Sequence, residues 1–301
     1  MDVSQMKRRG AVVTGAGSGM GRSIALSLAA NGMNVVIADI DKDAAERVCG
    51  EAGALGVESL AVPTDVSDLE QVESLAEVAY STFGDIAVLV NNAGVNWRPF
   101  RATWDASIED AQWMMNVNFW GVLHGHHAFV PRMRKTTDPK HIVNTSSIAT
   151  LQPSPGHAPY AAAKAAIDGF SLAARSEFEI AGLPIGLSLL YPGVVRTRIA
   201  TSERLRPIEQ QAAQRNLVPW DSYTGRPADT GAENREFIAE QRLVTHAHQA
   251  IDPDWVGPMV VNAITESRPY ILTHPFSDPI KERAEELLNS YVPAAASLTS
   301  Q

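Results

Sequence analysis

The sequence predicts a doubly wound α/β fold, in which helices cover both faces of a parallel sheet. Short runs rich in β-branched and other apolar residues alternate with longer helical patterns through the first two thirds of the chain. These runs are continuously apolar, which is typical of parallel strands buried on both faces. A length of 301 residues with no break in composition suits a single domain.

The expected elements follow each other in a regular order. Strands are expected at 11–14, 34–39, 57–63, 86–90, 141–145, 185–190 and 269–273. Helices are expected from about residue 20, at 42–52, after residue 68, and at 104–133, 159–181, 255–263 and 281–288. The single domain 1–301 then divides into a core over 10–197, a polar covering segment over 198–250, and a C-terminal helix, strand and tail over 251–301.

Composition excludes several classes of protein. Apolar residues make up 45% and charged residues 20% of the chain, which excludes disordered and collagen-like proteins. The net charge of −9 disfavours nucleic acid as a partner, since phosphate binding needs clustered Lys and Arg. The single cysteine, Cys49, allows no internal disulfide and lies in no metal-ligand pattern, so we expect no metal site. With no membrane-length apolar run, the expected location is the cytoplasm.

A glycine-rich turn follows the first expected strand and opens the first helix. Its spacing is T-G-x-x-x-G-x-G, with Thr14 followed by Gly15, Gly19 and Gly21. Where no Cβ intervenes, a pyrophosphate can approach the backbone and lie on the amides and positive dipole of a helix N-terminus. A tight turn used only for helix packing is the alternative, but the strand before and the helix after favour a dinucleotide loop.

An acidic residue closes the second expected strand. Asp39 lies 18 residues after Gly21, where a carboxylate accepts both hydroxyls of an adenosine ribose. It would repel a 2′-phosphate, and neither Ser18 nor Ile40 supplies a compensating cation. The sequence therefore predicts NAD rather than NADP, with Lys42 as the residue that could offset this preference.

Two further strand ends carry candidate cofactor contacts. Small residues at 91–94 would keep the edge of the sheet open beside a bound ribose, although an Asn-Asn-Ala-Gly run also forms simple turns. After the third strand, Asp65 and Val66 could flank the adenine, or Asp65 and Ser67 could merely start a helix.

Tyr160 and Lys164 stand four residues apart in an expected helix and therefore share one face. An ammonium about 5 Å from a phenol, at an effective dielectric of about 20, is worth roughly 3 kcal/mol. That is a pKa lower by roughly two units, so we expect Tyr160 to act as a general base or acid near neutral pH.

These motifs together resemble the classical short-chain dehydrogenase/reductase family. The shared features are the glycine turn, the Asn-Asn-Ala-Gly run, a serine thirteen residues before Tyr160, Y-x-x-x-K, and Pro192-Gly193 after the sixth strand. The resemblance covers roughly 10–197. It implies a seven-stranded Rossmann-type sheet, a nicotinamide cofactor, and a homodimer or homotetramer.

The resemblance also implies roles for individual residues. Tyr160 would be the catalytic base or acid, Lys164 would lower its pKa and hold the nicotinamide ribose, Ser147 would bind the substrate oxygen, and Asn118 would hold a water beside Lys164. Val195 and Thr197 would contact the carboxamide. The expected cofactor contacts are Gly15, Ser18, Gly19, Met20, Gly21, Asp39, Asp65, Val66, Asn92, Ala93, Gly94, Tyr160, Lys164, Pro192, Gly193, Val195 and Thr197. The implied reaction interconverts a secondary alcohol and a ketone.

The substrate is expected to be bulky and apolar or aromatic. Trp97 and Phe100, with Leu151 and Trp220, would line such a pocket beside Ser147 and Tyr160. Segments at 129–133, 202–207 and 269–275 also resemble, more loosely, a subgroup that includes dehydrogenases of lignin-derived aryl alcohols. His157 is more often a loop residue than a second acid.

Two other classes of protein share parts of this pattern. A non-catalytic dinucleotide-binding regulator on the same fold would lack one catalytic group, whereas Asn118, Ser147, Tyr160 and Lys164 are all present. An epimerase or dehydratase shares Y-x-x-x-K but usually has a differently spaced glycine turn and a larger C-terminal domain. The sequence therefore favours an oxidoreductase.

Overall fold

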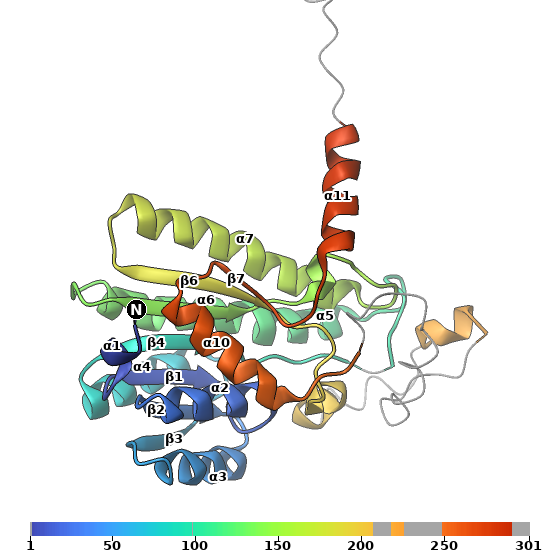
Figure 1. Cartoon of the computed structure of the whole chain (residues 1–301). Coiled ribbons are helices and arrows are strands. Elements are labelled where there is room, and N and C mark those ends of the chain that lie inside the picture. Colours follow the sequence, from blue (N-terminus) through green and yellow to red (C-terminus); the bar gives the residue numbers. More distant parts are fainter. Residues whose placement is uncertain (1, 98, 207–217, 226–248, 291–301) are drawn as a thin grey trace, which may run out of the picture.

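The structure, a computed structural model, describes residues 2–97, 99–206, 218–225 and 249–290 (Figure 1). Its strands are β1 (Gly10–Thr14), β2 (Asn34–Asp39), β3 (Ser59–Pro63), β4 (Ile86–Asn91), β5 (Lys140–Thr145), β6 (Ile185–Tyr191) and β7 (Tyr270–Leu272). Its helices are α1 (Val3–Met6), α2 (Gly19–Ala30), α3 (Lys42–Gly53), α4 (Leu69–Phe83), α5 (Ile108–Met115), the π-helix η1 (Asn116–Trp120), α6 (Gly121–Met133), α7 (Ala158–Ile180), α10 (Val256–Thr265) and α11 (Ser277–Asn289). Short 3₁₀ turns are η2 (Ile148–Thr150), η3 (Arg198–Leu205), η4 (Trp220–Tyr223) and η6 (Pro253–Trp255).

Seven parallel strands form one sheet in the order β3-β2-β1-β4-β5-β6-β7, which confirms the doubly wound prediction. The chain starts at β1, winds outward to β3, then returns to β4 and winds to β7 at the other edge. The direction of winding reverses between β1 and β4. Sheets of this kind bind ligands at the carboxyl ends of the strands beside such a reversal.

Two apolar clusters hold the helices on opposite faces of the sheet (Figure 1). One cluster packs α2, α3 and α10 through residues such as Leu28 and Val260. The other packs α4, α6 and α7 through residues such as Leu75, Phe129 and Phe178. Burial on both faces explains why the strands are continuously apolar in sequence.

The single helix expected over 104–133 is in fact three helices, α5, η1 and α6. α5 begins only at Ile108, because the Ser107 hydroxyl accepts a hydrogen bond from the Asp110 amide at 3.0 Å and so caps the helix. The π-helix carries Asn118, whose side chain pairs with both backbone polar groups of Val95, at 2.8 and 3.0 Å. Periodicity alone does not reveal such a wide turn.

The covering segment and the C-terminus differ from expectation in detail. Of the segment 198–250, the structure describes η3, η4 and their neighbours, while 207–217 and 226–248 lie outside the described residues, as does the tail at 291–301. The last helix, α11, starts at Ser277 and projects away from the sheet (Figure 1). Among the described helices, none combines the length and apolar character needed to cross a membrane.

Candidate active site

A cleft of about 2020 Å³ opens where β1, β4, β5 and β6 end. Ligand pockets are usually about 300–1,000 Å³, so this cleft has room for a dinucleotide and a second molecule. All the predicted cofactor residues line it, namely Gly15, Ser18, Gly19, Met20, Gly21, Asp39, Asp65, Val66, Asn92, Ala93, Gly94, Tyr160, Lys164, Pro192, Gly193, Val195 and Thr197.

The glycine turn adopts the close backbone geometry that its spacing predicts. Gly15 and Gly19 have φ of 64° and 55°, a region that residues with a Cβ rarely occupy. A Cβ on Gly21 would lie 2.2 Å from the Gly15 carbonyl oxygen. Ser18, the N-cap of α2, makes no side-chain cap, so the first amides of this helix face the cleft without an internal acceptor.

The Asp39 carboxylate is held at this turn. Its Oδ2 accepts a hydrogen bond from the Gly17 amide at 2.8 Å, and its Oδ1 accepts one from the Asp41 amide at 2.9 Å. Lys42 lies 3.6 Å from Glu46 on the exposed surface of α3. The nearby cation that could have offset Asp39 therefore has a carboxylate neighbour of its own.

Asn92 ties the end of β4 to the glycine turn. Its side-chain nitrogen donates to the carbonyl oxygens of Thr14 at 2.9 Å and Gly15 at 3.3 Å. Asp65 lines the cleft and also shapes its own turn, since its Oδ1 accepts hydrogen bonds from both the amide and the hydroxyl of Ser67. The residue that caps α4 is Asp68, so Asp65 shapes the turn before that helix, and its contact with adenine stays a prediction.

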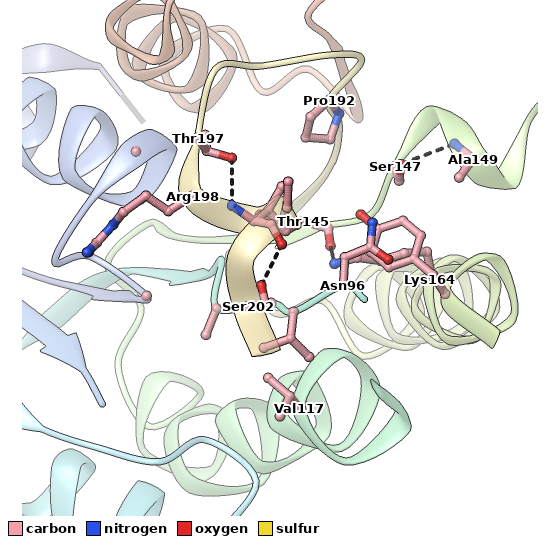
Figure 2. A pocket seen from close by; sticks show the side chains of 18 of the residues that line it. Asn96, Val117, Thr145, Ser147, Ala149, Lys164, Pro192, Thr197, Arg198 and Ser202 are labelled. Atoms are coloured by element: carbon pink, nitrogen blue, oxygen red, sulfur yellow. Dashed lines mark hydrogen bonds between the residues drawn. The ribbon is translucent and has the colours of Figure 1, made fainter. Parts of the chain in front are cut away.

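Ser147, Tyr160 and Lys164 all line the cleft, and Figure 2 labels Ser147 and Lys164 among the lining residues that it draws. Tyr160 is 7% and Lys164 2% exposed, on one face of α7. The side chains of Ser147 and Tyr160 lie close enough to each other to interact. The Lys164 ammonium donates to the Thr145 carbonyl oxygen at 2.8 Å and lies 5.7 Å from the centre of the Tyr160 ring.

The prediction that the pKa of Tyr160 is lowered is wrong for the protein alone. Burial raises the pKa of the Tyr160 phenol, and the hydrogen bond from Ser147 only partly opposes this. Burial also lowers the pKa of Lys164 to about 8. Burial desolvates both groups, and their spacing along the helix does not reveal this cost.

Asn118 lies behind the cleft rather than in its lining. It is fully buried, and its Oδ1 accepts from the Val95 amide at 2.8 Å. A Cβ on Gly94 would come within 3.1 Å of this oxygen and 3.5 Å of the Lys164 ammonium. The absence of a side chain at Gly94 therefore leaves space between Asn118 and Lys164.

The expected substrate contacts hold only in part. Phe100 and Trp220 line the cleft, whereas Trp97 and Leu151 do not. Trp97 is fully buried and packs with Trp113, and Leu151 packs on the cluster around Ile167 and Leu189. Clustering of aromatic residues in sequence does not tell which rings turn inward.

His157, for which the sequence favoured a simple loop role, is the N-cap residue of α7 and lines the cleft. Its ring stacks on Tyr160 with centroids 4.8 Å apart and planes 13° apart, and the Phe100 ring lies 4.3 Å away. The His157 Nε2 and the Asn96 side chain lie within hydrogen-bonding distance, at 2.8 Å. These contacts fix the wall of the cleft beside the Tyr160 phenol.

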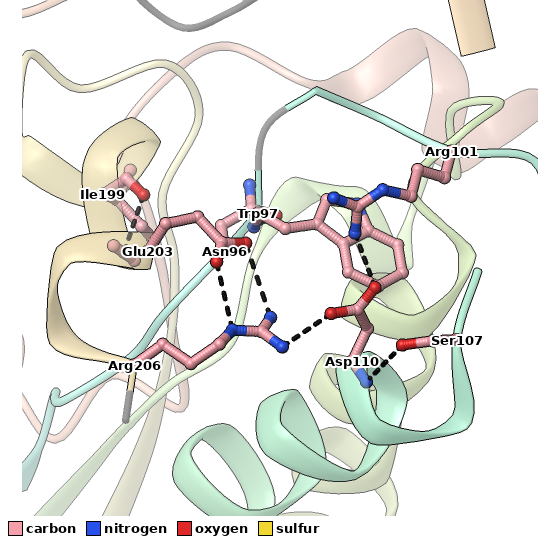
Figure 3. A network of polar contacts seen from close by, with 9 residues as sticks. Asn96, Trp97, Arg101, Ser107, Asp110, Ile199, Glu203 and Arg206 are labelled. Atoms are coloured by element: carbon pink, nitrogen blue, oxygen red, sulfur yellow. Dashed lines mark hydrogen bonds and ion pairs between the residues drawn. The ribbon is translucent and has the colours of Figure 1, made fainter. Parts of the chain in front are cut away.

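A buried ionic network joins the covering segment to the main fold (Figure 3). Asp110 is fully buried and accepts hydrogen bonds from Arg101 at 2.5 Å and from Arg206 at 2.6 Å. The Arg206 guanidinium lies 4.2 Å from the centre of the Trp113 ring and pairs with Glu203. The network fixes the end of η3 over the substrate side of the cleft.

Sequence reasoning missed several residues of the cleft, including Asn96, Arg198, Arg204 and Arg206. Asn96 and Arg198 belong to no motif that the sequence singles out. Arg204 and Arg206 lie in the segment 202–207, but neither its resemblance nor the density of arginines after residue 197 shows where each side chain points.

Comparison with known proteins assigns this architecture to a family. Residues 9–207 match the family model described as short chain dehydrogenase. A 1-deoxy-11-beta-hydroxypentalenate dehydrogenase of Streptomyces exfoliatus is 37% identical over 192 residues, which cover 64% of this chain and 69% of its own. The C alpha-dehydrogenase of Sphingobium sp. (strain NBRC 103272 / SYK-6) is 29% identical over 292 residues, which cover 96% and 87%.

A solved structure extends the likeness to nearly the whole chain. The crystal structure of a short chain dehydrogenase/reductase from Burkholderia phymatum, in complex with NAD, is 35% identical, with a TM-score of 0.81. The alignment covers 96% of this chain and 98% of that one. The protein therefore belongs to the short-chain dehydrogenase/reductase family of oxidoreductases.

Proposed function

We propose that this protein is an NAD-dependent oxidoreductase that interconverts a secondary alcohol and a ketone, with Tyr160 as the proton-transfer group. The observation that carries this proposal is the proximity of Ser147 and Tyr160, which are both buried and line the same cleft as the glycine turn and Asp39. A hydroxyl pair of this kind can bind one substrate oxygen and exchange a proton with it.

The residues present fit a nicotinamide dinucleotide. The uncapped N-terminus of α2 and the Cβ-free turn around Gly15 suit a pyrophosphate, and the Asp39 carboxylate suits the adenosine ribose. Lys164 and the space beside Gly94 suit the second ribose. When bound, the cofactor would supply the hydride acceptor or donor and, in its oxidised form, a positive charge beside the phenol.

Tyr160 and Ser147 would handle the proton. In ketone reduction Tyr160 donates its proton to the forming alkoxide, while Ser147 donates a hydrogen bond to the same oxygen. In alcohol oxidation the hydroxyl proton would pass to a Tyr160 phenolate as the carbinol hydrogen leaves with its electron pair for the cofactor. The raised pKa of Tyr160 keeps this group protonated in the free enzyme, so oxidation requires added positive charge in the cleft.

NAD is favoured over NADP by the position of Asp39. A 2′-phosphate would bring its negative charge to a carboxylate that two backbone amides already hold in place. A structural relative was solved with NAD, which is consistent with this preference.

The substrate side favours a bulky aromatic alcohol. The cleft wall beside Tyr160 includes Phe100, Trp113, His157 and Trp220. Large apolar faces with a few polar groups are typical of sites for such molecules. The similarity to a C alpha-dehydrogenase points in the same direction.

We also propose that the protein is a cytoplasmic homodimer or homotetramer.

A panel of secondary alcohols tests this function. The purified protein is given NAD or NADP with 1-phenylethanol, a bulkier aryl analogue, or 2-butanol, and reduced cofactor is measured by absorbance. The proposal predicts turnover of aryl substrates with NAD. A protein that binds NADH but oxidises none of these alcohols and reduces none of the matching ketones would instead support a non-catalytic dinucleotide-binding regulator.

A further inference from the structure

The chain segment that follows β6 crosses directly over the glycine turn. The Cγ2 atom of Thr197 lies 3.0 Å from the position that a Cβ on Gly19 would occupy. Arg198 follows immediately, and its side chain reaches toward the N-terminal part of the fold (Figure 2). A molecule lying on this turn would therefore have α2 on one side and the start of η3 on the other.

Arg198 and Arg204, both in η3, line the cleft beside this crossing, and both side chains are exposed. Within the described part of the chain, the Arg198 guanidinium makes no hydrogen bond or ion pair. Other arginines of the same stretch have carboxylate partners, since Arg196 pairs with Asp252 at 3.0 Å and Arg206 with Asp110 at 2.6 Å. Arg198 thus directs a cation into the cleft without a protein anion to neutralise it.

Arg204 fixes the backbone that carries Arg198. Its Nη1 donates to the Arg198 carbonyl oxygen at 3.1 Å, and to the carbonyl and hydroxyl oxygens of Thr201 at 2.8 and 3.1 Å. Burial and the neighbouring Arg198 lower the pKa of Arg204, whereas Asp39 and Asp41 act in the opposite direction. The Arg204 guanidinium therefore lies close enough to Arg198, and to the carboxylates after β2, to interact with them.

The charges around the glycine turn indicate which kind of ligand this part of the cleft suits. The amides at the N-terminus of α2 carry partial positive charge on one side of the cleft, and Arg198 supplies a full charge on the other. Planar guanidinium groups pair well with phosphate oxygens, often through two parallel hydrogen bonds. A diphosphate between them would be held from both sides.

We propose that Arg198 is a cofactor-binding residue that pairs with the pyrophosphate of the dinucleotide from the side opposite α2, and that Arg204 is the positioning residue that holds it there. This inference rests on the proposed function, because it needs a dinucleotide in the cleft. It assigns part of the cofactor affinity to the covering segment rather than to the glycine turn alone.

Calorimetric titration with NADH, NADPH, ADP-ribose and adenosine tests the proposal in wild type, Arg198→Ala, Arg198→Lys and Arg204→Ala. Loss of one charged hydrogen bond corresponds to about a tenfold change in affinity. We expect Arg198→Ala to weaken NADH and ADP-ribose by about that factor, with adenosine unaffected and a smaller dependence on salt. Arg198→Lys should lose less, and Arg204→Ala should weaken the same two ligands.

Arg134→Ala is the matched control, since Arg134 is an exposed arginine at the end of α6 and does not line the cleft. It removes the same charge and should leave all four affinities unchanged. Equal NADH affinity in wild type and Arg198→Ala would overturn the inference, and so would a loss confined to NADPH, which would place the contact at a 2′-phosphate. Wild-type protein that binds no dinucleotide would instead refute the proposed function.

Discussion

The two ends of the cleft are built in different ways. The cofactor end consists of turns at the ends of β1, β2 and β4, where the side chains of Asp39 and Asn92 hold backbone groups at the end of β1 and in the turn after it. The substrate end consists of side chains from distant segments, such as Phe100, Asp110, His157 and Arg206. Short motifs therefore predict the residues of the first end, whereas the second depends on how separate elements pack. The predictions below perturb one end and ask whether the other responds.

The largest expected effect separates chemistry from cofactor binding. Tyr160→Phe removes the proton-transfer group but keeps the ring that stacks on His157. General acid–base catalysis by a positioned side chain contributes about 10²–10⁴-fold, so kcat should fall by about 10³-fold. Steady-state kinetics with a turned-over aryl alcohol measures this.

The same variant should bind NADH with an affinity within about twofold of wild type, well below the tenfold that corresponds to 1.4 kcal/mol. Fluorescence titration of NADH provides that control. Turnover that survives in Tyr160→Phe would refute the assigned role. A parallel loss of NADH binding would show that the two ends are not independent.

The next largest effect is expected at the substrate end. Asp110→Asn leaves Arg101 and Arg206 buried without their shared carboxylate. Breaking a buried ion pair costs about 3–5 kcal/mol, so the free energy of unfolding should fall by about 3 kcal/mol. KM for the alcohol should rise because η3 loses its attachment at Arg206. Urea unfolding and steady-state kinetics measure the two effects.

Asp43→Asn is the matched control for this variant. Asp43 also lies in the first turn of a helix, α3, but it is exposed. Both substitutions therefore remove a similar interaction with the helix dipole. Only Asp110→Asn also leaves the charge of buried arginines unbalanced. Equal loss of stability in the two variants would contradict a role for the network.

A smaller effect is expected at the cofactor end. Gly21→Ala places a methyl group 2.2 Å from the Gly15 carbonyl oxygen and 2.6 Å from the Asn92 side-chain nitrogen. Overpacking of this kind costs about 1–3 kcal/mol and should weaken NADH by distorting the turn. Gly50→Ala is the control, because a Cβ there meets nothing within 4 Å. Similar NADH affinity in both variants would mean that the turn does not hold the cofactor.

The smallest effect concerns pH. Burial lowers the pKa of His126, in α6, and of His141, in β5, to about 4. Histidines of the unfolded chain protonate near pH 6.5, so the unfolded state binds more protons between about pH 6.5 and 4. Stability is therefore present above pH 6.5 and is lost as the pH falls toward 4.

His126→Gln should remove one such group while retaining an amide that can reach Asn144. Between pH 7 and 5.5 the wild type should lose about 1 kcal/mol more unfolding free energy than this variant. His127→Gln, at an exposed position of the same helix, should keep the wild-type slope. Equal slopes in wild type and His126→Gln would show that His126 protonates freely in the folded protein.

The contrast between the two ends explains which parts of the molecule the sequence predicts. The doubly wound sheet and the residues that line the cofactor end follow from apolar runs and short motifs. The turn at Gly15 and the carboxylate at Asp39 are of this kind, and both line the cleft as expected.

The rest depends on tertiary packing. Trp97 turns into the core while His157 stacks on Tyr160, and no spacing in the chain distinguishes the two cases. The π-helix around Asn118 depends on a bond to Val95, which is distant in sequence. The rise in the Tyr160 pKa depends on burial, which a helical spacing to Lys164 does not report.

Transfer of isotope tests the central claim most directly. The enzyme is incubated with NAD and 1-phenylethanol that carries deuterium on the carbinol carbon, and the reduced cofactor is examined by mass spectrometry and NMR. The proposed reaction predicts that NADH gains one deuterium at the nicotinamide ring with wild type, and that Tyr160→Phe yields almost none. NADH formed without the label, or the same yield from both proteins, would contradict it.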